Sequence, residues 1–319
     1  MSFTIVPLHH LSLDNGTSIP FGDGFALQDV PEWLRNEPIL KDIGYNQLQW
    51  MLESEHALVV EYDANAIGEL DATWKGKDPK SIQAVKEEIA VLANLALWLI
   101  HPTHVCFTNI FHAISHPIPG EGKRPIVQLV ETHSPLLVHP SDVGNVIAQN
   151  EVTKAGQIHQ VLCSIPRDNA VWTALRATWV ALTMNSADLR YACFWMGIEA
   201  LLGAEDNTGE VAFKLSQRAA LFLADSPERA REVFRKAKKC YGMRSKIIHG
   251  RWKHDPKIDE VMADTETIIR TVLLRLLDDP KLLNTFTTEQ RDRFLEDIVF
   301  SNATSVLTSS DAASLMDQI

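Results

Sequence analysis

The sequence predicts an α+β protein, with a β-rich N-terminal domain that contains one long helix and a C-terminal all-helical bundle. Two observations support this fold class. Short β-branched runs separated by Gly, Pro and Asp fill most of the first 140 residues, a pattern typical of strands and turns. From residue 141 onward, apolar residues recur at helical spacing between helix-capping residues, which predicts helix after helix.

This change of pattern sets the expected domain boundaries. We expect a β-rich domain of unknown role over residues 1–140, a helical domain over residues 141–302 with its core at about 188–279, and a flexible tail over residues 303–319. The tail is rich in Ser, Thr, Asp and Ala, and such chain ends are often poorly ordered.

Within the first domain, residues 56–62 and 66–74 are expected to form a strand pair. A long helix follows from about Ile82, and residues 105–114 and 125–131 are strand-like. In the second domain, Ser141-Asp142 is expected to cap the first helix, which would run to about Leu162.

Composition limits the class of protein. The chain is 45% hydrophobic and 22% charged, with a formal net charge of −11, which is ordinary for a globular protein and argues against one that coats nucleic acid. Four widely spaced cysteines suggest reduced thiols. The N-terminal residues lack the pattern of a signal peptide, and the apolar run from Ile89 to Ile100 is too short to span a membrane. We therefore expect a cytoplasmic protein without a membrane partner.

One segment departs from this acidic background. Residues 227–257 contain 11 Lys and Arg residues against 3 acidic residues, a net charge of +8 that leaves −19 for the rest of the chain. A concentrated positive segment on an acidic protein indicates a phosphate-bearing ligand. The alternative is a solvated helix, because the cations of its first part do not share one side: Arg229, Arg231, Arg235, Lys236, Lys238 and Lys239.

Arg244 and His249 are the candidate catalytic residues in this segment. Gly250 follows an apolar-periodic run, so His249 is expected in the last turn of a helix. There the helix dipole favours imidazolium while the neighbouring cations oppose it, a balance that suits an acid–base catalyst. Five residues of separation place the pair roughly 140° apart around a regular helix. A site therefore needs an irregularity after Gly242 or a second subunit.

Three segments together resemble the Apea-like branch of the HEPN superfamily. They are Arg190 to Leu202 (RYACFWMGIEALL), Lys214 to Ala220 (KLSQRAA), and Tyr241 to Gly250 (YGMRSKIIHG), the last containing the Arg-x4-His form of the family's Rx4-6H motif. The resemblance covers about residues 188–279. It implies a helical bundle, often a homodimer, with paired motifs at the dimer cleft.

The resemblance also implies an activity. Many members are metal-independent endoribonucleases of antiphage defence or toxin-like stress responses and leave 2′,3′-cyclic phosphate ends. By this resemblance we expect RNA and a second copy of the chain as partners, a protein trigger or antitoxin as a further one, and no cofactor or metal. The alternatives are a non-catalytic HEPN module that binds RNA, a nucleotide or a protein, and a unit that serves mainly for dimerisation.

Roles follow for residues at the matching positions. Arg244 would stabilise the phosphate charge and His249 would transfer the proton, while Glu199 would orient one of them or else form a salt bridge with Arg190 or Arg218. Supporting or RNA-contacting roles fall to a further set: Ser245, where many active members have Asn, Asp or His, Tyr241, which could stack on a base or lie in the core, and Lys246, Arg251 and Lys253.

Four histidines offer a competing metal hypothesis: His101, His104, His112 and His116. We do not expect a metal site there, because residues 105–114 look like a strand and neither HExxH nor a Cys pair accompanies them.

Overall fold

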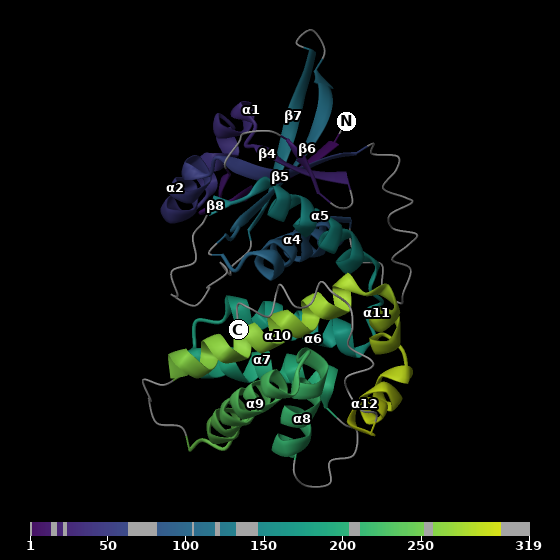
Figure 1. Ribbon diagram of the computed structural model, residues 1–319. Helices are drawn as coiled ribbons and strands as arrows, with labels where there is room; N and C mark the ends of the chain where they lie inside the picture. The colour runs from purple at the N-terminus through teal and green to yellow at the C-terminus, as the bar shows by residue number, and fades with distance from the viewer. Residues whose placement is uncertain are drawn as a thin grey trace. The chain divides into compact units, whose positions relative to one another are not determined.

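The computed structural model describes residues 2–13, 18–21, 24–62, 82–103, 105–118, 122–131, 146–203, 211–251 and 258–300. The chain divides into two compact units, Met1–Ser164 and Ile165–Ile319. An antiparallel sheet with helices forms the first unit, and helices form the described part of the second (Figure 1). The predicted α+β class is thereby confirmed.

The first unit is built on a six-stranded sheet in the order β3-β4-β5-β1-β6-β7, in which every neighbouring pair is antiparallel. The strands are β1 (Ser2–Leu8), β3 (Ile19–Pro20), β4 (Phe25–Asp29), β5 (His56–Tyr62), β6 (Asn109–Ile118) and β7 (Gly122–Glu131). A separate parallel pair joins β2 (Ser12–Leu13) to β8 (Val146–Ile147). The expected strand at 66–74 lies outside the described residues.

Helical segments cover both faces of this sheet. Because side chains alternate along each strand, successive residues contact the two covering layers in turn. Ile5, Val59 and Phe111 share a core with residues of the segment that follows β4, which forms α1 (Glu32–Arg35), the 3-10 helix η2 (Pro38–Asp42) and α2 (Tyr45–Glu53). On the opposite face, Phe25 packs against His159 of α5 (Gln149–Ser164), and α5 packs on α4 (Ile82–Ile100). The sheet therefore lies between two helical layers.

The boundary between the units falls after Ser164 rather than near Pro140. The reason is that α5 packs on α4 and β3 of the first unit. Gly156 brings it close to the chain there, since an added Cβ would lie 3.0 Å from the Pro20 carbonyl oxygen. The expected cap at Ser141-Asp142 lies outside the described residues, and the helix itself begins at Gln149, after β8. Residues 303–319 lie outside the described part.

The second unit contains α6 (Ala170–Thr183), α7 (Ala187–Leu202), α8 (Val211–Leu223), α9 (Pro227–Ile248), α10 (Ile258–Asp278), α11 (Pro280–Phe286) and α12 (Gln290–Phe300). Helices α6 and α7 approach closely at Gly197, where a Cβ would meet the Ala174 carbonyl oxygen at 3.3 Å. Helix α9 packs against α7, α8 and α10, so it holds its residues against three neighbours.

Candidate active site

Helix α9 carries most of the candidate residues, and its start is well defined. The Ser226 side chain accepts a hydrogen bond from the Arg229 backbone N–H, and Pro227 occupies the first turn, which together favour a helix start. The helix continues through Gly242 to Ile248. The irregularity considered after Gly242 is therefore absent from α9, and one continuous helix separates Arg244 from His249 by roughly 140° around its axis.

The C-terminus of α9 is closed by a Schellman motif. Gly250 has a φ of +64°, its N–H donates to the Ile247 carbonyl, and the Arg251 N–H donates to the Lys246 carbonyl. This 5→2 and 6→1 pattern requires a left-handed residue, which favours glycine. His249 is consequently the residue at the helix end, as expected, and its side chain is exposed.

Arg244 lies on the opposite side of α9 and contacts α7. Its Nη2 donates to Oε2 of Glu199 over 2.9 Å, and the two side chains are 22% and 27% exposed. The hydroxyl of buried Tyr191 on α7 donates to the carbonyl of Cys240, one turn before Arg244. These two bonds fix the position of Arg244 relative to α7.

The second oxygen of Glu199 gives the pair its electrostatic character. Oε1 is buried and has no hydrogen-bond partner among the described residues. Burial raises the pKa of the Glu199 carboxyl above its ordinary value, whereas the charge and hydrogen bond of Arg244 act to lower that pKa. Burial is the larger effect, so the carboxylate is only partly compensated by its cation.

Tyr241 completes the contact between α7 and α9. Its ring meets Trp195 edge-on with centroids 5.2 Å apart, and the Arg244 guanidinium carbon lies 5.5 Å from the Tyr241 centroid. Burial raises the pKa of its phenol, Arg244 lowers it and Glu199 raises it. Tyr241 is only half-buried, so it packs against the site while keeping part of its ring accessible.

The structure thus brings Glu199, Tyr241 and Arg244 together and leaves His249 elsewhere on α9. Ser245 is half-buried, and its carbonyl accepts from the His249 N–H at 3.1 Å. Lys246 and Arg251 are exposed beside the helix end, while Lys253 lies outside the described residues. Within one chain, the described geometry places His249 with the exposed cations rather than with Arg244.

Arg190 and Arg218, the other candidate partners of Glu199, contact backbone carbonyls. Arg190 donates to the Met184 carbonyl just beyond the end of α6. Arg218 donates to the Leu202 carbonyl at the end of α7. Both guanidiniums therefore satisfy helix ends, which is a structural role.

No group of three or more His, Cys, Asp or Glu suited to a metal occurs among the described residues. His112 is on β6, where its Nδ1 lies 3.0 Å from the Thr4 hydroxyl. His101 pairs with Glu151 of α5 at 3.1 Å. His104 lies outside the described residues, and the His116 side chain is likewise not described.

Among the cations of α9, Arg229 pairs within the helix with Glu232 at 2.7 Å, and the others fall into two groups. Three of them pair with other helices: Lys236 with Asp264 at 3.6 Å, Lys239 with Glu260 at 2.8 Å, and Arg244 with Glu199. We call the exposed residues that pair with no other helix among the described residues the basic face of α9: Arg231, Arg235, Lys238, Lys246 and His249. These five positions fall within about 80° of arc and span about 27 Å of helix. Part of the basic segment therefore does form one surface.

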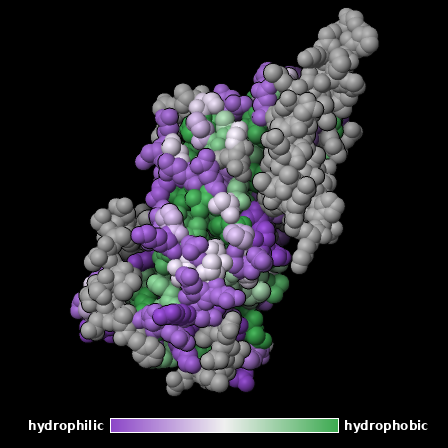
Figure 2. All heavy atoms as spheres, turned by 90° about the vertical axis from the view of Figure 1, so that its right-hand side faces the viewer, coloured by the Kyte–Doolittle hydropathy of each residue, from purple (hydrophilic) through white to green (hydrophobic). Residues whose placement is uncertain are grey.

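Comparison with protein-family models, curated proteins and solved structures finds no match for this chain. The HEPN resemblance accordingly depends on the three sequence segments alone. Among the described residues, no helix is long and apolar enough to cross a membrane. Figure 2 shows hydrophobic residues in separate patches between hydrophilic ones on one face.

Two surface features were not anticipated from the sequence. Leu189 and Met196 of α7 are 52% and 55% exposed, and Cys193 lies between them on the same side of the helix. Between α8 and α9, the Phe213 and Phe234 rings pack 5.4 Å apart beside a hollow. The seven-residue spacing of Leu189 and Met196 is a sequence signal that could have indicated the apolar stripe on α7. The hollow between α8 and α9 has no such signal, because it depends on how the two helices pack.

Proposed function

We propose that the protein is a metal-independent endoribonuclease of the HEPN type that acts as a homodimer. The observation that carries this proposal is the partly buried Arg244, which Glu199 holds in place at the surface of α7 and α9. Among the described residues, Glu199 binds only one Nη of the guanidinium. The remaining N–H groups suit a phosphate, for which arginine's planar fork is well shaped.

The chemistry assigned to these residues is a transesterification within the RNA. The His249 imidazole takes the proton of a ribose 2′-hydroxyl, and the 2′-oxygen attacks the adjacent phosphorus. The bond from phosphorus to the 5′-oxygen breaks, and the protonated His249 imidazole donates a proton to that oxygen. Arg244 stabilises the charge on the pentacoordinate phosphate. The products are a 2′,3′-cyclic phosphate and a 5′-hydroxyl, and no metal is needed.

A second copy is part of the proposal because one chain keeps Arg244 and His249 apart. The apolar stripe formed by exposed Leu189 and Met196 with half-buried Cys193 between them lies on α7, the helix that also carries Glu199. Exposed apolar stripes of this kind are typical of protein interfaces. Pairing two copies across this stripe would give one cleft with residues from both chains.

The basic face of α9 favours a second candidate function, a non-catalytic module that binds RNA. Among the described residues, Arg235 and Lys238 have no acidic partner, and Arg231 contacts only the exposed Glu228 at 3.7 Å. Such cations are available for phosphate contacts, which are sequence-independent and salt-dependent. This candidate needs neither His249 chemistry nor a dimer.

Cleavage of a synthetic oligoribonucleotide in the presence of EDTA separates the two. The variants are His249→Asn, which changes an exposed side chain, and Arg244→Lys, which keeps a cation beside Glu199 but loses the guanidinium fork. His10→Asn, an exposed histidine of the first unit, is the matched control. We expect cleavage with cyclic phosphate ends by the natural sequence and the control, and a loss of at least about 100-fold in both variants.

Equal cleavage by all four proteins would contradict the proposal. Absence of cleavage together with RNA binding that His249→Asn leaves unchanged would favour the binding module. Sedimentation of the natural sequence and of Met196→Lys tests the dimer, because a charge placed in an apolar interface disfavours association.

A further inference from the structure

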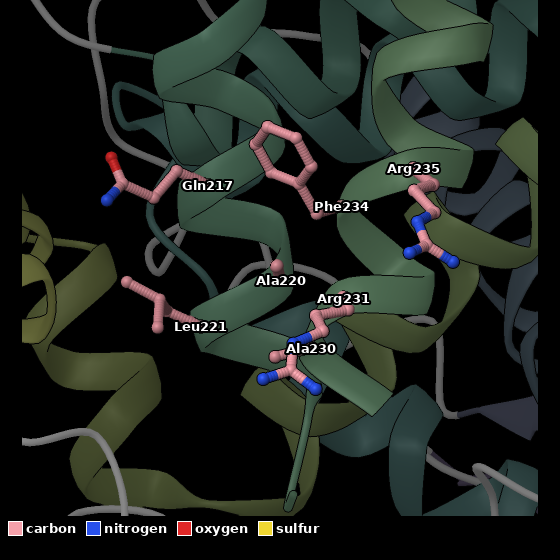
Figure 3. A pocket seen from close by; sticks show the side chains of 7 residues that line it. All are labelled: Gln217, Ala220, Leu221, Ala230, Arg231, Phe234 and Arg235. Carbon is pink, nitrogen blue, oxygen red and sulfur yellow. The ribbon is translucent and has the colours of Figure 1, made fainter. Parts of the chain in front are cut away.

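The surface between α8 and α9 is hollowed at a place that the proposed nuclease site does not use. The hollow has a volume of about 330 Å³, within the range of about 300–1,000 Å³ typical of small-ligand sites. Gln217, Ala220 and Leu221 of α8 line one side, and Ala230, Arg231, Phe234 and Arg235 of α9 line the other (Figure 3). Its walls are therefore largely apolar, with two guanidiniums and one amide.

One aromatic residue, Phe234, lines this hollow. The half-buried Phe234 meets Phe213 with ring centroids 5.4 Å apart in a T-shaped arrangement, and Phe213 is 45% exposed. The Lys238 ammonium lies 5.8 Å from the Phe234 centroid. A partly accessible aromatic ring beside cations matches what single-stranded nucleic-acid sites use, since bases stack on such rings while cations hold the phosphates.

The two arginines are available for an anion. Arg235 has no acidic partner among the described residues, and the Arg231 guanidinium is 3.7 Å from Glu228 in a pair that is 70% and 78% exposed. Exposed pairs of this kind contribute little and exchange readily for a better partner. Both residues belong to the basic face, which continues from the hollow toward His249.

We propose that this hollow is a nucleotide-binding site, in which Phe234 and the neighbouring aliphatic side chains hold a base while Arg231 and Arg235 bind its phosphate. Gln217 supplies a donor and an acceptor for the edge of the base. The nucleotide is either free or part of an RNA strand that follows the basic face. This site goes beyond the proposed ribonuclease activity, because binding does not require Arg244 or a cleavable strand.

Binding of AMP and of a 2′-O-methyl oligoribonucleotide to the full-length protein tests the proposal. The modified strand has no free 2′-hydroxyl and cannot be cleaved by the proposed chemistry. Its binding therefore measures this site independently of whether the protein is a nuclease. The variants are Arg231→Gln with Arg235→Gln, and Phe234→Leu. Lys281→Gln with Arg293→Gln, which removes two exposed cations from α11 and α12, is the control of equal charge.

We expect the double arginine variant to weaken binding at least about tenfold and to reduce the slope of log K against log salt by about 1.4 for the strand. Phe234→Leu should weaken binding about tenfold with no change in that slope. Ala230→Met, which fills the hollow and keeps every charge, should also weaken binding.

Binding of either probe, with these losses in the variants, supports the site. Binding of AMP indicates a free nucleotide as the ligand, and binding of the oligoribonucleotide alone indicates a nucleotide within an RNA strand. Binding that falls equally in the control, or that is insensitive to Phe234→Leu and Ala230→Met, would mean general attraction of anions and overturns it. No binding of either probe by the natural sequence overturns it as well. Circular dichroism melts of each variant exclude loss of folding as the cause.

Discussion

Removing either member of the Arg244–Glu199 pair should have unequal consequences for stability. Arg244→Met leaves the Glu199 carboxylate partly buried, with Oε1 already lacking a partner. A hydrogen bond between charged groups contributes about 1.5–3 kcal/mol, so we expect a loss of about 2 kcal/mol at pH 7. For a unit of this size that loss lowers Tm by about 4–8 °C. Glu199→Gln should cost less, about 1 kcal/mol, because a neutral amide needs less solvation.

The pH dependence of this difference provides the sharper test. Burial raises the pKa of Glu199 in the folded protein, so its charged form destabilises the fold as pH rises from the unfolded pKa through the folded one. Removing Arg244 takes away the one effect that lowers this pKa, so Arg244→Met should recover stability as pH falls and Glu199 protonates. Thermal melts of the natural sequence, both single variants and the double variant from pH 7 to 4 measure this. A loss in Arg244→Met that is no greater than in Glu199→Gln, or that is independent of pH, would refute the reasoning.

Other predictions concern the first unit and the ends of helices. Burial lowers the pKa of His9 from 6.5 to about 4, so its contribution is intact above pH 6.5 and about 3 kcal/mol is lost as pH falls from 6.5 to 4; denaturant unfolding should show this loss for the natural sequence and His10→Asn but not for His9→Gln. Gly242→Ala should stabilise α9 by about 1 kcal/mol, because a Cβ there meets nothing within 4 Å, whereas Gly250→Ala at φ +64° should destabilise it by about 1 kcal/mol; equal Tm shifts in the two variants would contradict the helix-end argument. Asn169→Ala should cost about 1 kcal/mol, since its side chain accepts from the Trp172 N–H, and a melt within error of the natural sequence would show that the cap is unimportant.

Several elements could be predicted because their signals are local. The β-branched run of β5 and the apolar period of α4 predicted these two elements at the right residues. Residues 31–53 were missed, because α1, η2 and α2 are short and owe their burial to packing on the sheet. The start of α5 was missed for a similar reason: β8 depends on pairing with distant β2.

The candidate site was predictable in part. Gly250 indicated where α9 ends, and counting residues indicated that Arg244 and His249 diverge. The choice of Arg244, rather than Arg190 or Arg218, as the partner of Glu199 depends on how α7 packs against α9, which no single-segment pattern contains. The hollow beside Phe234 arises in the same way, from side chains of two helices that only tertiary packing brings together.

The division of the α9 cations has a consequence for how the protein responds to ionic strength. Lys236, Lys239 and Arg244 fasten this helix to acidic residues of α7 and α10, and a partly buried pair such as Arg244 with Glu199 is weakly screened. The outward cations face solvent, where the Debye length is about 8 Å at physiological salt. Raising the salt concentration should therefore release a bound polyanion well before it loosens α9. On the proposal of a polyanion bound at the basic face, the helix would release that polyanion at a salt concentration at which its own fold persists.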